Sequence, residues 1–287
     1  MLDHLPFDLL VHKMSDVHGN MLKGNNDAKV QFERFLNFCI KNPQIRVLDP
    51  WQNVQVLLNR KATYDLCVHA SETTPVRDLF QVPKAVYLNT IQDAKHQGIL
   101  LFPSVCKRQK ACGTGESHHM VLVQSKEALP QLESYFHPNE PVVFQEFIPH
   151  DGALVKVYVA DGQLFTYVRP SFKNNFGDCA FFDSQTMPKA FDDPSLGTTE
   201  KRQPSIVNTD ISIKKKLEAC IDHERLQTIA HHLQKQLGVT MYGFDVLLKS
   251  GSMDAYYVVD VNYFPSFKEV KDFHIIYTNI LNQHVTP

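Results

Sequence analysis

Residues 242–264, YGFDVLLKSGSMDAYYVVDVNYF, contain the pattern that decides the fold. Two apolar runs are joined by a glycine-containing turn at 250–254, which predicts two neighbouring strands. Asp245 lies inside the first run, whereas Asp260 and Asn262 end the second. Because Asp260 and Asn262 are two residues apart, their side chains point to the same face of a strand. Oxygen ligands that converge from adjacent strands are what Mg²⁺ needs beside nucleotide phosphates.

A different explanation stays open for these acids, because a lone Asp at a strand end is usually a solvent-facing side chain. That explanation is weakest for Asp245, which lies between Phe244 and Val246. An unpaired carboxylate among apolar neighbours would be costly to bury. The hairpin therefore favours a magnesium site over a solvated surface.

Strands and helices alternate in the N-terminal part of the chain, a rhythm typical of an α/β lobe with a mostly parallel sheet. We expect a strand at 7–12, a helix from Asp27 as N-cap to 41, a strand at 45–48 and a helix at 51–58. Further along, the pattern predicts strands at 100–107, 120–124 and 142–148, a hairpin at 154–169, and a helix at 220–237. Residues 192–216 lack periodicity and predict a mobile surface loop.

Basic residues near the ends of these elements are candidates for binding phosphate. Lys107 ends a strand just before the glycine-bearing loop 112–118, whose backbone N–H groups are able to cradle a phosphate, although a simple glycine turn is the commoner explanation. Lys156 interrupts an apolar strand, where a cation needs an anionic partner. Any one of the others, taken alone, would be a solvated surface residue; they are Lys13, Arg60, Lys110, His118, Arg169 and Lys173.

Composition limits the class of protein. The 287 residues are 43% hydrophobic and 21% charged, as in ordinary globular proteins. A formal net charge of -2 gives no overall attraction to nucleic acid or to an anionic membrane. The six cysteines are scattered without a CxxC pair, and no run approaches the roughly 18 apolar residues of a membrane span. We therefore expect a cytoplasmic protein with reduced thiols and no nucleic-acid or membrane partner. A monomer is also expected, although composition does not determine the oligomeric state.

Several motifs occur in an order that resembles the inositol-tetrakisphosphate 1-kinase family. They are DP(x)nR at 49–60, Lys107 followed by CGTGESH at 112–118, VVFQEFIPH at 142–150, LVKVYV at 154–159, RPS at 169–171, YGFDVLL at 242–248 and VVDVNYFPSF at 258–267. The resemblance runs from about Phe7 to near the C-terminus. It implies an α/β (α+β) ATP-grasp fold, with an N-terminal α/β lobe at 1–62, a central lobe at 63–146 and a C-terminal lobe with the metal site at 147–287.

The resemblance also assigns roles to individual residues, with ATP and two Mg²⁺ ions as cofactors and a soluble inositol polyphosphate as the acceptor. Expected ATP contacts are Arg60 and Lys107 for the phosphates, Gln145, Glu146, Phe147 and Ile148 through Lys156 for adenine and ribose, and Ser171 and Ser184. Expected metal ligands are Asp245, Asp260 and Asn262. Expected acceptor contacts are Lys13, His118, Lys156, Asn262 and Ser266, of which His118 and Lys156 are also the catalytic candidates.

Two departures from the family pattern bear on activity. The family normally begins with a further strand and helix that carry another substrate-binding lysine, and this chain lacks them, so we expect an open sheet edge and one phosphate contact fewer. Ser266 stands where the family usually has glycine. Serine keeps the same backbone contact only if its φ is negative.

Three functions are compatible with this sequence. The first is a kinase that transfers the γ-phosphate of ATP to a hydroxyl of inositol tris- and tetrakisphosphates. The second is an ATP-grasp ligase that joins a carboxylate to an amine, because the nucleotide half of the site would look the same. The third is a shortened, weakly active or inactive binding module. Several cations on the acceptor side favour the kinase, since they suit a multiply phosphorylated ring.

Overall fold

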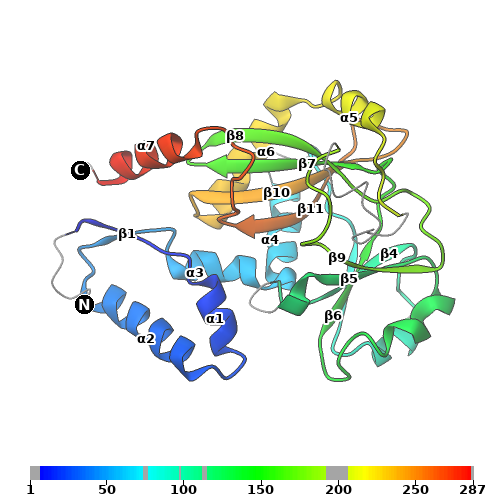
Figure 1. The fold of residues 1–287 in the computed structure, drawn as a ribbon, viewed down its shortest axis with the longest axis horizontal. Coiled ribbons are helices and arrows are strands. Elements are labelled where there is room, and N and C mark those ends of the chain that lie inside the picture. Colours follow the sequence, from blue (N-terminus) through cyan, green and yellow to red (C-terminus); the bar gives the residue numbers. More distant parts are fainter. Residues whose placement is uncertain (1–6, 74–76, 97, 112–114, 192–205, 286–287) are drawn as a thin grey trace.

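The computed structural model describes residues 7–73, 77–96, 98–111, 115–191 and 206–285. Within these residues the strands form three sheets, which contain two, five and four strands (Figure 1). The two larger sheets come from the middle and the C-terminal part of the chain, and the small sheet from its N-terminal part. None of the described helices is long and apolar enough to span a membrane.

The N-terminal part pairs β1 and β2 in parallel, as expected for an α/β lobe. Its elements are β1 (Leu9–Val11), α1 (Ser15–Met21), α2 (Asn26–Lys41), β2 (Arg46–Leu48), α3 (Trp51–Val54) and the 3₁₀ turn η1 (Gln55–Leu58). Helix α2 begins at Asn26, and its N-cap is Asn25, not Asp27 as predicted, because the Asn25 side chain accepts a hydrogen bond from the Ala28 N–H at 2.9 Å. Phe32 of α2 packs edge-on against Trp51 of α3.

The central sheet is antiparallel, with the strand order β3-β6-β4-β5-β9. Its strands are β3 (Ala85–Leu88), β4 (Ser104–Arg108), β5 (His119–Val123), β6 (Val142–Glu146) and β9 (Cys179–Asp183), with the 3₁₀ turns η2 (Gln92–His96), η3 (Gly115–His118) and η4 (Lys126–Leu132) between them. One face packs on η2 and η4 through a cluster that includes Cys106, Val121 and Phe144. The opposite face carries Lys107 and Gln145, which makes it the face of the expected nucleotide site.

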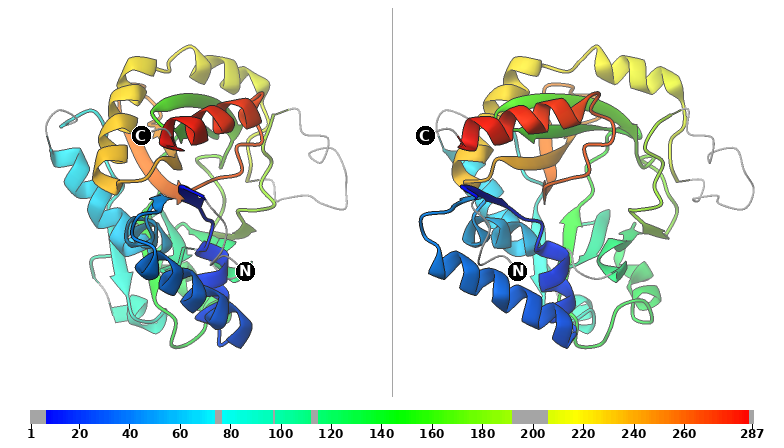
Figure 2. Two further views of the ribbon diagram at one scale, coloured as in Figure 1. Left: turned by 90° about the vertical axis from the view of Figure 1, so that its left-hand side faces the viewer. Right: turned by 60° about the vertical axis from the view of Figure 1, so that its left-hand side comes forward.

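The C-terminal sheet has the order β11-β10-β7-β8 and is also antiparallel. It consists of β7 (Ala153–Ala160), β8 (Gln163–Pro170), β10 (Met241–Leu248) and β11 (Tyr256–Tyr263). The largest core cluster joins one face of this sheet to α4 (Arg60–Glu72), α5 (Ile211–Glu218) and α6 (His223–Leu237). α7 (Phe273–Val285) covers one end of the other face, as the two views in Figure 2 show.

The register of the C-terminal sheet sets the geometry of the site. On β10, Asp245 lies opposite Asp260 of β11 on one side and opposite Lys156 of β7 on the other. The β10–β11 pairing shifts register between Asp245 and Val246. The extra residue, Val259, lies on β11. It moves the core-facing positions of this strand from Tyr256 and Val258 to Val261 and Tyr263, so Asp260 and Asn262 lie on the same face of the sheet as Asp245.

Some predicted segments differ from the structure. The expected loop at 192–216 falls partly outside the described residues, but 211–218 form α5, which Asp210 caps by accepting from the Ser212 N–H. α5 is stabilised by packing of Ile213 and Leu217 against the main core, which a local search for periodicity misses. Residues 112–114 of the glycine-bearing loop also lie outside the described part. The sequence did not predict α1, α4, β3, β9 or α7.

The three sheets follow one another along the chain in the order of the three expected lobes. The exception is β9, which follows β7 and β8 in sequence but belongs to the central sheet. The lobe boundaries at 62 and 146 remain a prediction. The cysteines within the described residues are unpaired; they are Cys39, Cys67, Cys106, Cys179 and Cys220.

Candidate active site

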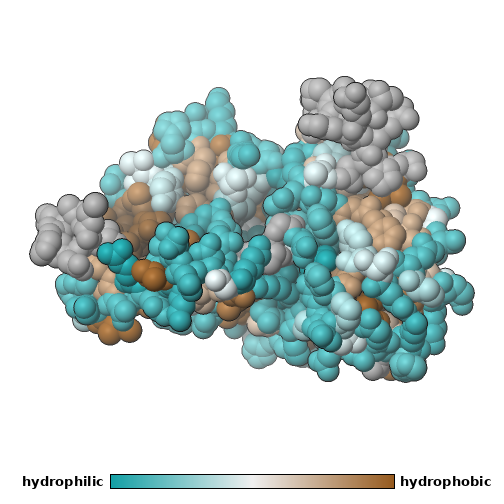
Figure 3. All heavy atoms as spheres, turned by 60° about the horizontal axis from the view of Figure 1, so that its bottom comes forward, coloured by the Kyte–Doolittle hydropathy of each residue, from teal (hydrophilic) through white to brown (hydrophobic). Residues whose placement is uncertain are grey.

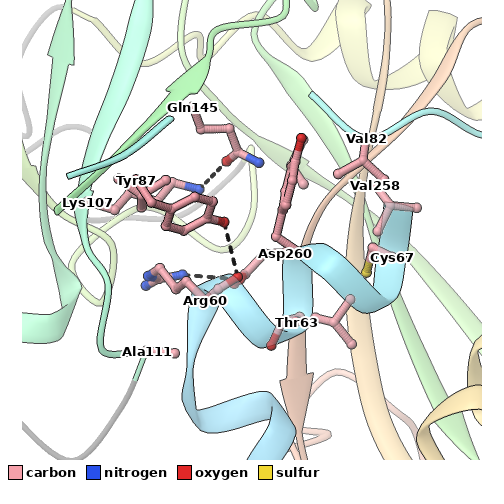
Figure 4. A pocket seen from close by; sticks show the side chains of 14 residues that line it. Arg60, Thr63, Cys67, Val82, Tyr87, Lys107, Ala111, Gln145, Val258 and Asp260 are labelled. Atoms are coloured by element: carbon pink, nitrogen blue, oxygen red, sulfur yellow. Dashed lines mark hydrogen bonds and ion pairs between the residues drawn. The ribbon is translucent and has the colours of Figure 1, made fainter. Parts of the chain in front are cut away.

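A pocket lies where α4 and the central sheet meet β11 of the C-terminal sheet (Figure 4). Its wall includes Arg60 from α4, Tyr87 from β3, Lys107 from β4, Gln145 from β6 and Asp260 from β11. Elements from three separate stretches of the chain therefore place charged side chains around one space. In the space-filling view, hydrophilic residues predominate where the surface is hollowed between the two halves of the molecule (Figure 3).

The three oxygen-bearing side chains of the β10–β11 hairpin come together as predicted. Asn262 Nδ2 donates to Asp260 Oδ2 at 2.8 Å, and Asp245 lies directly across the strand pair from Asp260. Each carboxylate also has a cationic partner: Lys156 Nζ lies 2.6 Å from Asp245 Oδ1, and Arg60 Nη1 lies 3.3 Å from Asp260 Oδ1. Burial would favour the neutral form of Asp260, but the charges of Arg60, Lys107 and Lys156 hold its pKa below the ordinary value.

This donor set fits a divalent cation that prefers oxygen ligands. Asp260 is ionised, and the side chains of Asp245 and Asp260 keep 21% and 31% of their surface exposed, which leaves room for an ion and its waters. No group of three or more His, Cys, Asp or Glu side chains that would suit a metal occurs among the described residues. The two carboxylates and one amide are thus typical of a Mg²⁺ site that is completed by phosphate oxygens, rather than of a zinc centre.

Arg60 is positioned by the first turn of α4. Asn59 caps this helix by accepting from the Lys61 and Ala62 N–H groups, which places Arg60 at the helix N-terminus. Its guanidinium donates to Asp260, to the Arg108 carbonyl at 3.1 Å and to the Ser117 carbonyl at 3.4 Å. A guanidinium held between the hairpin and the loop after β4 suits a role in binding phosphate.

Lys107 faces the same space from the central sheet. Its ammonium donates to Gln145 Oε1 at 2.6 Å, and the side chain is buried (Figure 4). Burial, together with the positive charge of Arg60, lowers the pKa of Lys107 to about 8, although the carboxylates of Asp260 and Asp245 oppose the shift. A buried ammonium with a neutral hydrogen-bond partner is suited to an anionic ligand.

A model of the inositol 1,3,4-trisphosphate 5/6-kinase ATP-grasp domain matches residues 75–283. The chain belongs to this family. A similar protein is the inositol-tetrakisphosphate 1-kinase of Xenopus laevis, which is 29% identical over 99% of this chain and 68% of its own length. The Danio rerio inositol-tetrakisphosphate 1-kinase is 27% identical over 93% and 65%, and the Arabidopsis thaliana inositol-tetrakisphosphate 1-kinase 3 is 25% identical over 96% and 71%. This chain thus spans about two thirds of these relatives.

Solved structures bear out the fold of this inositol phosphate kinase family member. A RimK domain ATP-grasp protein from Sphaerobacter thermophilus has a TM-score of 0.52 at 15% identity, over 85% of this chain and 73% of that one. A peptide-associated ATP-grasp ligase from Chryseobacterium gregarium, solved with ADP, has a TM-score of 0.54 at 15% identity, over 92% and 71%. At this identity the similarity shows the ATP-grasp fold alone, and the prediction of that fold is confirmed.

Two of the expected acceptor residues, His118 and Lys13, contact elements next to the expected metal ligands. His118 ends η3; its Nδ1 lies 3.3 Å from Ser184 Oγ, and the Ser184 N–H donates to its carbonyl. Burial and the positive charge of Arg60 lower the pKa of His118. Lys13 follows β1 and lies over the ring of Phe264, 5.6 Å from its centroid, two residues beyond Asn262. Their roles in binding the acceptor remain a prediction.

The expected adenine segment lies at the end of β6. The Glu146 and Phe147 N–H groups already donate to the carbonyls of Lys84 and Pro103, and the Phe147 side chain is buried. Ser171 is also buried, and its hydroxyl lies 2.8 Å from His150 Nε2. Of this segment, Gln145 lines the pocket. The part of Gln145 to Ile148 in adenine binding, and that of Ser171, remains a prediction.

Ser266 does not have a positive φ, so it meets the condition for serine to replace the glycine that the family usually has at this position. Its neighbours Phe264 and Phe267 have left-handed φ values of 38° and 51°, and Ser266 is not among the described residues with positive φ. The strain of the turn therefore falls on the two phenylalanines, which pack into the cluster beneath α7. Serine is compatible with the local chain path.

Three residues near the site escaped the sequence reasoning. Asp49, recognised only as part of a motif, accepts hydrogen bonds from the backbone N–H groups of Thr240 and Met241 and so ties the N-terminal part to the start of β10. Glu269 forms an ion pair with Arg169, and Lys189 lies in the same charged environment. Glu269 and Lys189 are in loops, where no periodic pattern indicates which way a side chain points.

Proposed function

We propose that this protein is an ATP- and Mg²⁺-dependent kinase that phosphorylates a hydroxyl of a soluble inositol tris- or tetrakisphosphate. The observation that carries the proposal is the juxtaposition of two carboxylates and an amide on one hairpin with three cations from other elements. Asp260 meets Arg60, Asp245 meets Lys156, and Lys107 is close enough for both carboxylates to influence its pKa. Membership of the inositol phosphate kinase family supports the same reaction class.

The residues of the site suit phosphoryl transfer, which needs positioning and charge neutralisation more than a strong base. Arg60 and Lys107 would hold the ATP phosphates from α4 and β4, and Asp245, Asp260 and Asn262 would hold Mg²⁺. When bound, Mg²⁺ supplies positive charge to the transferred phosphoryl group. Lys156 is paired with Asp245 in the absence of ligands, so metal binding by Asp245 would free its ammonium for the incoming phosphate.

The acceptor side favours a polyphosphate over a carboxylate. Lys13, His118 and Lys156 lie around the end of the hairpin, and several cations suit a ring with several phosphates. A ligase remains the alternative in reaction class, because ligases share the fold, and a binding module remains the non-catalytic alternative. Two Mg²⁺ ions, a monomeric state and a cytoplasmic location also remain expectations.

The test is incubation of the protein with ATP, Mg²⁺ and a panel of inositol tris- and tetrakisphosphates, followed by chromatography of the products. We expect ADP and an inositol phosphate with one phosphate more. ADP release that depends on an added carboxylate and amine would instead support a ligase. Binding of inositol phosphates without turnover would support a binding module.

Asp260→Asn tests the metal assignment, because it removes one metal-binding charge while keeping the side-chain shape. We expect turnover to fall by about 10²-fold or more, with an unchanged far-UV circular dichroism spectrum. The matched control is Asp254→Asn, the same chemical change at an exposed position in the turn of the same hairpin, which should retain full activity. Full activity of Asp260→Asn would end the metal assignment.

A further inference from the structure

A second charged cluster lies on the C-terminal sheet beside the expected acceptor site. Arg169 is on β8, two residues beyond Tyr167, which pairs with Lys156 of β7. Because residues two apart on a strand share a face, Arg169 points to the same side of the sheet as Lys156. Glu269, from the loop between β11 and α7, reaches over to this face and forms an ion pair with Arg169.

Tyr158 joins this ion pair to the acceptor site. Its hydroxyl donates to Glu269 Oε2 at 2.6 Å and accepts from Arg169 Nη2. The Lys156 ammonium and the Arg169 guanidinium each lie 5.9 Å from the centroid of the Tyr158 ring. Both cations thus lie close to one buried aromatic ring. The same Tyr158 side chain links Glu269 to Lys156, the lysine that is expected to contact the acceptor.

Positive charge exceeds negative charge around this ring. The Lys189 ammonium donates to the Ser184 carbonyl at 3.1 Å. Its partial desolvation and the positive charges of Arg169 and Lys156 lower the pKa of Lys189. Asp245 and Glu269 are the carboxylates that raise this pKa. If Asp245 binds a metal ion, Glu269 is the one carboxylate of these two that still balances the charges of Lys156, Arg169 and Lys189.

The ion pair leaves donor capacity unused. Arg169 Nε is buried and has no hydrogen-bond partner among the described residues, although the Nη2 end of the guanidinium is fully engaged. Burial would favour a neutral Glu269, but the hydrogen bond from Tyr158 and the charge of Arg169 keep its pKa below the ordinary value. Glu269 is therefore an ionised carboxylate in a place that also suits a phosphate.

We propose that Arg169 and Lys189 form a phosphate-binding pair beside Lys156, and that Glu269 occupies this pair as a built-in competitor for one phosphate of the acceptor. The proposal rests on the proposed kinase function and names the residues that set its acceptor specificity. A phosphate monoester has more negative charge and more acceptor oxygens than a carboxylate, so it displaces Glu269 when the acceptor places a phosphate there. An acceptor without a phosphate at this position leaves the ion pair closed.

Glu269→Gln tests the proposal because it removes the competing charge while keeping a hydrogen-bond acceptor for Tyr158 and Arg169. We expect the KM for the acceptor to fall about fivefold, with the KM for ATP unchanged. The two acceptors to compare are inositol 3,4,5,6-tetrakisphosphate and inositol 1,3,4-trisphosphate, and the fall should be larger for the one that places a phosphate at Arg169. The matched control is Glu218→Gln on α5, which removes the same charge on the opposite side of the sheet and should change neither KM.

Coupling between variants separates a specificity role from a structural one. Lys189→Ala, at an exposed position, should raise the acceptor KM about threefold, and Glu269→Gln should give no gain when Arg169 is replaced by alanine. A merely structural Glu269 would lower the melting temperature of Glu269→Gln and leave the acceptor KM unchanged or higher, and that result would overturn the proposal.

The outcome also distinguishes this proposal from the proposed function. If the wild-type protein is an active kinase and Glu269→Gln has the same acceptor KM, the specificity proposal is wrong and the proposed function stands. If the wild type does not turn over, calorimetric titration of both proteins with the same two inositol phosphates replaces the KM measurement. Tighter binding by Glu269→Gln would then support the competitor role without a kinase, and equal binding or none would overturn it.

Discussion

Replacement of Lys107 by methionine should stabilise the ligand-free protein while weakening its binding of ATP. The fall in the Lys107 pKa from 10.5 to about 8 means that the folded state holds the charged ammonium less well than water does. At about 1.4 kcal/mol per pKa unit, this corresponds to about 3 kcal/mol of destabilisation at neutral pH. Loss of the hydrogen bond to Gln145 offsets about 1 kcal/mol, so the variant should gain about 2 kcal/mol, or about 5 °C in Tm.

The pH dependence of this gain has a defined sign. A lysine with a depressed pKa in the folded state destabilises the fold fully below its folded pKa, and the penalty disappears as pH rises towards the unfolded value. The Tm difference between Lys107→Met and the wild type should therefore be constant below about pH 8 and shrink above it. Differential scanning fluorimetry at several pH values, without nucleotide, measures this difference directly.

ATP should reverse the order of stability. The phosphates supply the anionic partner that Gln145 does not, so Mg·ATP should raise the Tm of the wild type more than that of the variant, and the KM for ATP should rise at least tenfold in Lys107→Met. The control is Lys84→Met, at an exposed lysine next to β3 on the same sheet, which should change neither value. A lower Tm for ligand-free Lys107→Met, or a difference that grows with pH, would refute the reasoning.

Two further predictions concern the scaffold of the site. Gly243→Ala should destabilise the fold by about 1–3 kcal/mol, because a Cβ there would lie 2.9 Å from the Val157 carbonyl oxygen. Urea denaturation measures this loss, and an unchanged midpoint would contradict it. Asp49→Ala should lower the free energy of unfolding by about 3 kcal/mol, because alanine leaves the Thr240 and Met241 N–H groups without an acceptor. Asp49→Asn should lower it less, because asparagine keeps one oxygen. Equal melting temperatures of the two variants would argue against this role of Asp49.

Much of the candidate site was predictable because its motifs are local. Two apolar runs joined by a glycine-containing turn predicted β10 and β11, and the spacing of Asp260 and Asn262 put both on one face. The apolar surroundings of Lys156 correctly indicated an anionic partner, which is Asp245. Each of these inferences needed only the period of a strand and the cost of burying a charge.

The pairings across the molecule were decided by the tertiary structure. Arg60 meets Asp260 across 200 residues of sequence because α4 packs on the same core as β11. Glu269 meets Arg169 through a loop whose path depends on the packing of Phe264 and Phe267 beneath α7. α5 and β9 are short elements that gain their stability from a core or a sheet made elsewhere. Local periodicity specifies which face a side chain occupies, whereas only packing of distant elements determines which charges face one another.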